Sequence, residues 1–206
     1  MSRRLTAQDW IAFGLSTLAR EDFAALKADV LARKLDVSRG SFYWHFADLN
    51  DFHARVIQGW KQVATEAIIA DIERHAAPQA RLDALLRHAF GSGAALEVRM
   101  RAWAEHNRAA ARALADVDRR RRGYIERMLI AAGIAPAAAA TRTQVLYWTY
   151  LGAALSRERL AAALLERVVA ELKQIGLRRV TANLSGSADA GGRMRRRYKR
   201  NDVAKA

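Results

Sequence analysis

The chain has 206 residues, of which 51% are hydrophobic, and it contains no cysteine. It is long enough to bury the core of one domain or two. The lack of cysteine excludes disulfides, thiolate catalysis and zinc sites built on cysteine. A formal net charge of +14 favours a polyanionic partner, although a basic stretch near residue 200 contributes to that figure.

The opening residues, MSRRLTAQDW, lack the apolar run of a signal peptide, and no stretch reaches the roughly 18 apolar residues of a membrane helix. We therefore expect a cytoplasmic protein with no membrane partner. The chain holds only two prolines and has long alanine-rich stretches. Because no segment shows the β-branched alternation of strands, the predicted fold is all-α.

A capping box predicts the first helix. Thr6 and, three residues later, Asp9 can satisfy two free N–H groups at a helix start. Ile11, Leu15 and Leu18 then supply its buried stripe. We expect this helix to support the two that follow it.

The stretch LKADVLARKLDVSRGSFYWHF, which begins at Leu26, predicts two short helices joined by a tight turn. The first ends at about Leu35. Ser38 offers a hydroxyl to the start of the second, which is predicted from Arg39 to about Phe46. Two helices joined in this way form a helix-turn-helix, so the N-terminal part is a three-helix headpiece.

The second helix of this motif carries aromatic side chains on two faces. Phe42 and Phe46 lie one turn apart on one face, while Gly40 and Trp44 point almost the opposite way. Tyr43 lies beside them, so two large aromatics with polar tips are predicted outside the core. Such a surface is typical of one that meets a partner.

Duplex DNA is a partner whose chemistry fits these residues. Arg39 can place its guanidinium against guanine O6 and N7, Ser41 can bond a base edge or phosphate, and Tyr43 can donate to a phosphate oxygen. Gly40 lets the backbone approach closely. The alternative is an ordinary helical hairpin with surface aromatics.

The sequence VSRGSFYWHF, preceded by LARKL and a capped helix, resembles the DNA-binding segment of the TetR (tetracycline repressor) family of bacterial transcription regulators. The resemblance is specific over about residues 5–56. It implies that the second helix is the recognition helix and that the protein binds double-stranded DNA at a palindromic operator, as a homodimer that senses a small-molecule effector. The implied DNA-binding residues are Lys27, Ser38, Arg39, Gly40, Ser41, Tyr43, Trp44 and His45.

Three positions depart from that family's pattern. The usual glycine of the turn is Asp36 here, and aspartate tolerates the left-handed conformation better than most residues. A common threonine at the start of the preceding helix is Lys27, which can reach a phosphate as a point charge. A lysine that often follows the recognition helix corresponds to Leu49.

A long helix with Asp48 as its N-cap is predicted to run to about residue 75 and to stop before Pro78. Gly133 marks another stop. Five further helices are predicted, at residues 81–90, 96–107, 109–132, 137–155 and 157–175. We interpret residues 51–178 as a helical bundle for ligand sensing and dimerisation, following a headpiece at residues 1–50.

Nothing in this body predicts an enzyme. The five histidines are scattered, and none pairs with another at the spacing of a helical zinc site. The run Gly91-Ser92-Gly93 follows a helix and reads as a turn, not a phosphate loop. We expect no metal and no cofactor.

Helical bundles often hold small-molecule sites between their helices, lined by aromatic and methionine side chains. For each candidate the alternative is an ordinary core position. His106, one turn from Trp103, adds a polar group. The predicted ligand-binding residues are Phe90, Met100, Trp103, His106, Tyr124, Met128, Tyr147 and Trp148, with Trp60 as a further candidate.

The last two helices carry more apolar surface than a lone bundle needs, which predicts a homodimer with a four-helix interface. Their apolar stripe consists of Val145, Leu146, Trp148, Tyr150, Leu151, Leu155, Leu160, Leu164, Leu165, Val168, Val169 and Leu172. The arginine run at 119–122 is expected on a solvated face.

The last segment, residues 179–206, is predicted to be a flexible basic tail. A Gly- and Ser-containing linker at 185–192 is followed by RMRRRYKR at 193–200, without an acidic residue. Such a tail can lie along phosphates or can be a bystander. The preferred interpretation of the whole chain is a TetR-type repressor; the alternative is a non-specific nucleic-acid-binding or adaptor protein that uses this tail.

Overall fold

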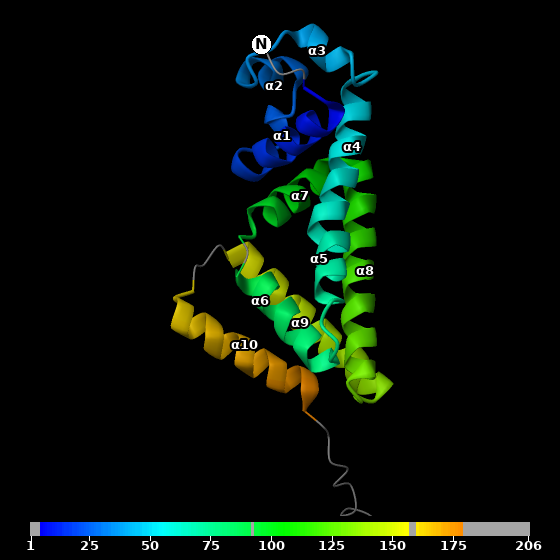
Figure 1. Cartoon of the computed structure of the whole chain (residues 1–206), viewed down its shortest axis with the longest axis vertical. Coiled ribbons are helices and arrows are strands. Elements are labelled where there is room, and N and C mark those ends of the chain that lie inside the picture. The colour runs from blue at the N-terminus through cyan, green and yellow to red at the C-terminus, as the bar shows by residue number, and fades with distance from the viewer. Residues whose placement is uncertain (1–4, 92, 157–159, 179–206) are drawn as a thin grey trace, which may run out of the picture.

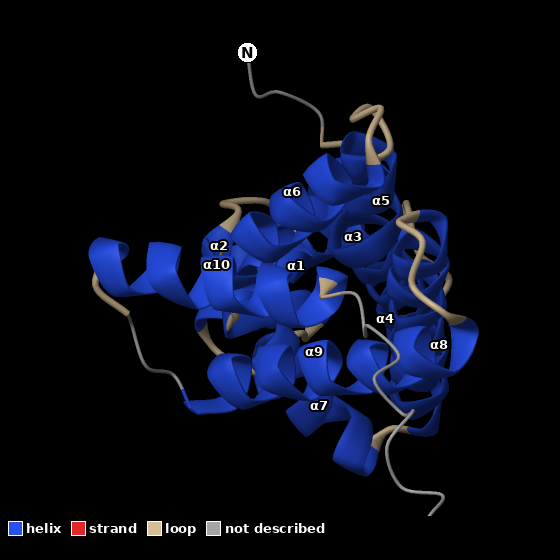
Figure 2. Cartoon of the chain, turned by 90° about the horizontal axis from the view of Figure 1, so that it is seen from below, coloured by secondary structure: helices blue, strands red, loops and turns tan. Residues whose placement is uncertain are grey.

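The computed structural model describes residues 5–91, 93–156 and 160–178. Within these ranges the regular elements are helices and short helical turns, and Figure 2, in which strands would be red, draws none there. The predicted all-α fold is confirmed. Figure 1 shows an elongated molecule with the N-terminal helices at one end. The predicted basic tail, 179–206, lies outside the described residues.

The predicted three-helix headpiece is present. It consists of α1 (Ala7–Arg20), a 3₁₀ turn η1 (Phe23–Ala25), α2 (Ala28–Lys34) and α3 (Arg39–Tyr43). The capping box is confirmed, because the Asp9 amide donates to Thr6 Oγ1 over 3.2 Å and the Thr6 amide donates to the Asp9 carboxylate over 2.8 Å. The predicted cap of α3 is wrong in one respect: the Ser38 side chain makes no capping hydrogen bond.

Helix α3 is shorter than predicted. It ends at Tyr43, and the next two residues form a turn. Phe46 therefore leaves the helix, and its ring centroid lies 5.0 Å from that of Phe42 and 5.0 Å from that of Phe52. Packing of these three rings takes Phe46 out of the register that helical periodicity alone predicted.

The turn between α2 and α3 is a Schellman motif. The amide of Val37 donates to the carbonyl of Ala32 over 3.0 Å, and the amide of Asp36 donates to the carbonyl of Arg33 over 3.2 Å. Asp36 has a φ of 53°, the left-handed conformation that glycine adopts most easily. Aspartate thus occupies a backbone position suited to glycine.

A long helix connects the headpiece with the body, as predicted. It consists of α4 (Leu49–Lys61), a π-helical turn η2 (Gln62–Glu66) and α5 (Ala67–Ile72), and Asp48 caps it by accepting from the Asp51 amide over 2.8 Å. Figure 1 shows it lying beside α8 (Arg108–Ala131). The π turn, which was not predicted, lies part-way along this helix.

The other body helices are α6 (Pro78–Gly91), α7 (Ala95–His106), α9 (Pro136–Ser156) and α10 (Ala162–Leu177). Pro78 and Pro136 each begin a helix. The long helix ends before Pro78, and Gly133, with a φ of 87°, follows the end of α8, so the two predicted stops are confirmed. Helix α10 begins at Ala162, later than the predicted residue 157, and runs to Leu177.

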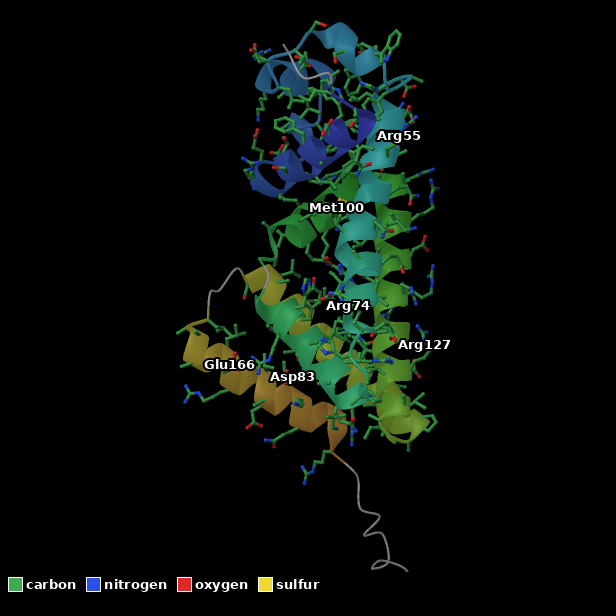
Figure 3. All side chains as sticks on the ribbon, in the orientation of Figure 1. Arg55, Arg74, Asp83, Met100, Arg127 and Glu166 are labelled. Atoms are coloured by element: carbon green, nitrogen blue, oxygen red, sulfur yellow. The ribbon has the colours of Figure 1, made fainter. Side chains whose placement is uncertain are left out.

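Ion pairs link α10 to α6. Lys173 Nζ lies 3.0 Å from Asp83 Oδ1, and Arg87 Nη1 lies 2.6 Å from Glu166 Oε1. Figure 3 labels Asp83 and Glu166 on these two neighbouring helices. These partly exposed pairs position α10, while Val169 and Leu172 bury its inner face.

Two clusters of buried apolar side chains form the core. The first joins the headpiece to the long helix, to α7 and to the first half of α8, and it includes Trp10, Phe52, Trp60 and Trp103. The second lies among α5, α6, α8, α9 and α10. The first cluster therefore continues across residue 50, and the domain limits at residues 50 and 178 stay predictions.

Candidate DNA-binding surface and internal cavity

Buried aromatic packing orients α3. Phe42 is fully buried, and its ring meets Trp10 edge-on at 5.4 Å and Phe52 at 5.2 Å between centroids. Because one face of this short helix is held against α1 and α4, the opposite face must point away from the protein.

That outer face carries the polar and aromatic groups. Tyr43 is 45% exposed and Trp44 is 73% exposed. Arg39 Nη2 donates a hydrogen bond of 3.0 Å to the Tyr43 hydroxyl, and its guanidinium carbon lies 5.4 Å from the centre of the Tyr43 ring. Gly40 is exposed, and the nearest atom that an added Cβ would meet is Ser38 Oγ at 3.7 Å. The surface therefore offers a cation, a hydroxyl and an indole beside accessible backbone.

A partly open cavity of about 280 Å³ lies in the body, between the end of α4, the η2–α5 segment, α6, α8, α9 and the start of α7. Its wall is mainly apolar. The apolar lining side chains include Val63, Ile68, Ile69, Leu82, Leu85, Leu86, Phe90, Leu96, Ile125 and Leu146. Such a space, with a few polar groups on its wall, suits a small organic molecule.

One side of the cavity is charged. Glu97 is buried, and Arg101 and Arg121 pair with its two carboxylate oxygens: Arg101 Nη2 lies 2.7 Å from Oε1 and Arg121 Nη1 lies 2.9 Å from Oε2. Arg101 Nη2 also lies 2.8 Å from Asp118 Oδ1, to which the Tyr147 hydroxyl donates over 2.6 Å. Charges of opposite sign thus alternate around the buried carboxylate of Glu97.

Arg121 also holds the π turn of the long helix. Its Nε donates to Thr65 Oγ1 over 3.3 Å and its Nη2 donates to the Ala64 carbonyl over 3.0 Å. Burial raises the pKa of Tyr150, which also lines the cavity, to about 12. The expectation that residues 119–122 are a solvated face is wrong for Arg121, because buried Glu97 and the π turn supply its partners.

No family model matches the sequence, and no curated protein matches it. Solved structures share its fold, among them the following two. One is the reduced form of E. coli NemR, a TetR-family regulator, with 18% identity and a TM-score of 0.67 over 82% of this chain and 96% of that chain. The chain has a TetR-type fold. The other, a transcriptional regulator from Rhodococcus sp. Rha1, has 21% identity and a TM-score of 0.67 over 84% of this chain and 95% of that chain.

In this TetR-type fold, the other residues predicted to bind DNA differ in their surroundings. Lys27 and Ser38 are exposed at the starts of α2 and α3, and Ser41 is half-buried. His45 is half-buried, with its Nε2 2.8 Å from the carbonyl oxygen of Leu5. Its ring therefore holds Leu5 near the end of α3. The eight DNA contacts stay predictions.

The residues predicted to bind a ligand separate into three groups. Phe90, Tyr124 and Tyr147 line the cavity, as does Trp60. Three others are buried elsewhere, and two are exposed. The buried residues are Met100, Trp103 and Met128, and the exposed ones are His106 and Trp148.

Trp103, on α7 of the body, packs against the headpiece. It stacks on Phe23 at 4.7 Å and meets His53 at 5.5 Å, centroid to centroid. Figure 3 places Met100 on α7 close to the headpiece. Both side chains belong to the first core cluster, outside the cavity wall, because α7 turns this face toward α1 and η1.

Sequence reasoning missed Glu97 and Arg121, the charged pair of the cavity. A signal was available in the sequence: Glu97 and Arg101 stand four residues apart, with Val98 and Met100 between them. Over the residues described, no cluster of histidine, aspartate and glutamate suited to a metal ion is found. In the same ranges, none of the helices has the length and apolar character needed to cross a membrane.

Proposed function

We propose that this protein is a cytoplasmic, ligand-responsive transcription repressor that binds a palindromic operator as a homodimer. The observation that carries the proposal is the exposed surface at α3, where Arg39 and Tyr43 project from a helix whose other face is buried at Phe42, and Trp44 projects from the turn that follows. The TetR-type fold and the regulators that share it support the proposal. In this interpretation Arg39 and Trp44 read sequence, while Tyr43 and Lys27 position the protein on the phosphates.

Exposed apolar side chains on the last two helices support the dimer. Val145, Trp148 and Leu155 are exposed on α9, and Leu164 and Ile175 are exposed on α10, with Trp148 at 65%. Pairing these faces about a two-fold axis would bury them in a four-helix interface. A dimer of this kind can place two recognition helices about 34–36 Å apart, one turn of DNA.

The long helix supports a response to a ligand. Residues of η2 and α5 line the cavity, and α4, which continues from them, packs against the headpiece. Trp60 both lines the cavity and belongs to the core cluster of the headpiece. A ligand that changes the position of this helix would therefore change the position of α3. Because the chain has no cysteine, this response uses no thiol oxidation.

Selection of bound fragments from random duplex DNA by the purified full-length protein tests the function. We expect an enriched palindrome whose half-site centres lie about 10 base pairs apart. Binding that enriches no motif, and that weakens uniformly with salt, would favour the non-specific nucleic-acid-binding protein instead. An absence of any DNA binding would contradict both.

A further inference from the structure

We infer that Glu97 makes the cavity selective for uncharged, largely apolar ligands, because its carboxylate neutralises Arg121 in the cavity wall. This inference rests on the proposed function, which assigns a small-molecule effector to the cavity. It adds the chemical class of that effector and the residue that sets this class. Three observations carry it: the place of the Glu97–Arg121 ion pair, the partners of both side chains and the apolar surface around them.

The guanidinium of Arg121 lies in the wall of the cavity. Its Nε donates to Thr65 Oγ1 over 3.3 Å, its Nη2 donates to the Ala64 carbonyl over 3.0 Å, and its central carbon lies 5.7 Å from the centre of the Tyr150 ring. Its Nη1 donates to Glu97 Oε2 over 2.9 Å. Each of these partners is itself a lining residue. The positive charge is therefore held beside the space that a ligand would occupy.

Glu97 supplies the opposite charge. Its side chain is 5% exposed, and its two carboxylate oxygens accept from Arg101 and Arg121. Among the described residues of the wall, the side chains charged at pH 7 are Glu97 and Arg121. Burial and the nearby Arg121 charge lower the pKa of His88, so this other titratable lining residue is neutral at that pH. The wall therefore carries no net charge.

A charged ligand would have to break this pairing. An anion could reach the charge of Arg121 only by displacing Glu97, and a cation could reach Glu97 only by displacing Arg121. Either exchange leaves a buried charge without its partner, which is strongly unfavourable. The rest of the wall is mainly apolar and offers no other counter-charge. An uncharged apolar molecule needs neither exchange, so it should bind best.

Removal of the carboxylate should change the class of ligand. Glu97→Gln keeps nearly the same shape but leaves Arg121 as an uncompensated charge in a wall of low dielectric. A ligand carboxylate in the cavity would then replace the negative charge that the variant lacks. This effect is electrostatic and acts over several ångströms, so it requires no particular hydrogen bond between ligand and protein.

Asp118 offers a matched control. Its Oδ1 lies 2.8 Å from Arg101 Nη2, and neither of these two residues lines the cavity. Asp118→Asn also keeps the shape of the side chain and changes the net charge of the protein by the same amount as Glu97→Gln. Arg121 keeps its partner in this variant. The comparison therefore separates the position of the lost charge from its effect on net charge.

Three naphthalene probes test the inference on the full-length protein. They are 2-naphthamide, which is uncharged; 2-naphthoate, an anion of nearly the same shape; and 2-naphthylmethylammonium, a cation. Binding is measured by titration calorimetry at pH 7. For the unaltered protein we expect 2-naphthamide to bind about tenfold or more tightly than either charged probe, because only the charged probes disturb the buried ion pair.

In Glu97→Gln the affinity for 2-naphthoate should rise by about tenfold or more, the lower end of what a close charge pair contributes at an interface, and the affinity for the cation should fall. In Asp118→Asn the ratio of naphthoate to naphthamide affinity should stay near its value in the unaltered protein. A double variant, Glu97→Gln with Arg121→Gln, should lose the gain in naphthoate affinity, because the wall is again without net charge. Taking the ratio within each variant removes effects of cavity shape that the two probes share.

Four results would overturn the inference: tighter binding of a charged probe to the unaltered protein, an unchanged naphthoate affinity in Glu97→Gln, an equal gain in Asp118→Asn, or no binding of any probe. If Glu97→Gln fails to fold, the ranking of the three probes on the unaltered protein still decides the ligand class.

DNA binding is measured separately on the selected operator. Naphthamide binding without any change in operator affinity would contradict the effector role and leave the ligand class intact. Operator binding by a protein that prefers a charged probe would contradict the ligand class and leave the regulator intact. The two failures are therefore distinguishable.

Discussion

The guanidinium of Arg39 and the hydroxyl of Tyr43 are joined by a hydrogen bond of 3.0 Å on the exposed face of α3. The two residues stand one helical turn apart, so the helix itself sets their separation. In the proposed complex with DNA, this hydrogen bond would order a long arginine side chain in advance, and ordering in advance lowers the entropy cost of binding.

Replacing Arg39 by alanine should weaken operator binding by about 1–3 kcal/mol and relax discrimination at one base pair in each half-site, because the variant cannot make a bidentate hydrogen bond to a base. Lys27→Ala is the matched comparison. It should weaken all sequences alike and reduce the log–log salt slope by roughly 0.9 for each phosphate that is no longer neutralised. Titrations on the operator and its single-base variants measure both effects. Unchanged base preference in Arg39→Ala would show that this residue does not read sequence.

Trp148→Arg should produce a monomer. The substitution places a charge at a large exposed apolar side chain of α9, in the proposed interface. Loss of an aromatic anchor weakens the free energy of dimerisation by about 2 kcal/mol or more. This change raises the dimer dissociation constant by about thirtyfold or more. Light scattering across a concentration series measures this change. Ile130→Arg alters an exposed apolar residue of α8 and should leave the oligomeric state as it is; equal effects of the two substitutions would refute the interface.

Gly14→Ala should destabilise the headpiece. A Cβ at this position of α1 would lie 2.8 Å from Phe52 Cζ and 3.1 Å from Val56 Cγ2, and both side chains are fully buried on α4. Overpacking of this kind costs about 1–3 kcal/mol, which exceeds the helix-propensity gain of up to about 1 kcal/mol. Urea unfolding measures the difference in the free energy of unfolding between the variant and the unaltered protein. Gly123→Ala is the control, because its nearest contact is the mobile end of Arg127, and it should be neutral or stabilising.

Asp36→Gly should raise the free energy of unfolding by about 0.5–1 kcal/mol, because glycine adopts the φ of 53° without the steric cost that aspartate bears. Asp36→Ala should lower it by about 1 kcal/mol, since alanine bears that steric cost and lacks a polar side chain that favours this conformation. Opposite signs in urea unfolding are the expected result. If both variants shift stability in the same direction, the left-handed turn does not control it.

His53 should make folding stability depend on pH. Its Nε2 lies 2.9 Å from the Leu26 carbonyl oxygen, and burial lowers its pKa below the ordinary value of 6.5. The unfolded chain therefore binds the proton more readily than the folded chain. The contribution of neutral His53 to the free energy of unfolding is full above pH 6.5 and is lost as the pH falls toward the lowered pKa.

Urea unfolding between pH 8 and pH 5 should show this loss, at up to about 1.4 kcal/mol per pH unit for one proton. His53→Gln keeps a neutral donor for Leu26 and should flatten the profile. Part of the slope should remain, because burial also lowers the pKa of His88. Identical profiles for the variant and the unaltered protein would exclude His53 as the titrating group.

The sequence by itself determined the local features of this protein. Thr6 and Asp9 meet across one turn, Phe42 and Tyr43 occupy different faces of α3, and Gly133 follows the end of α8. These features depend on residues only a few positions apart. Backbone geometry and side-chain periodicity specify them without reference to the rest of the chain.

Only the tertiary structure decided which helix packs against the apolar face of each other helix. Arg121 lies within an arginine run that would suit solvent, yet its partner Thr65 comes from 56 positions away and brings it into the cavity wall. Trp103 and Trp148 carry the same side chain on helical segments, but one is buried against the headpiece and the other is exposed on α9. Periodicity predicts that a helix has an apolar face. Periodicity does not predict which distant helix buries that face, because burial depends on contacts between segments far apart in the chain.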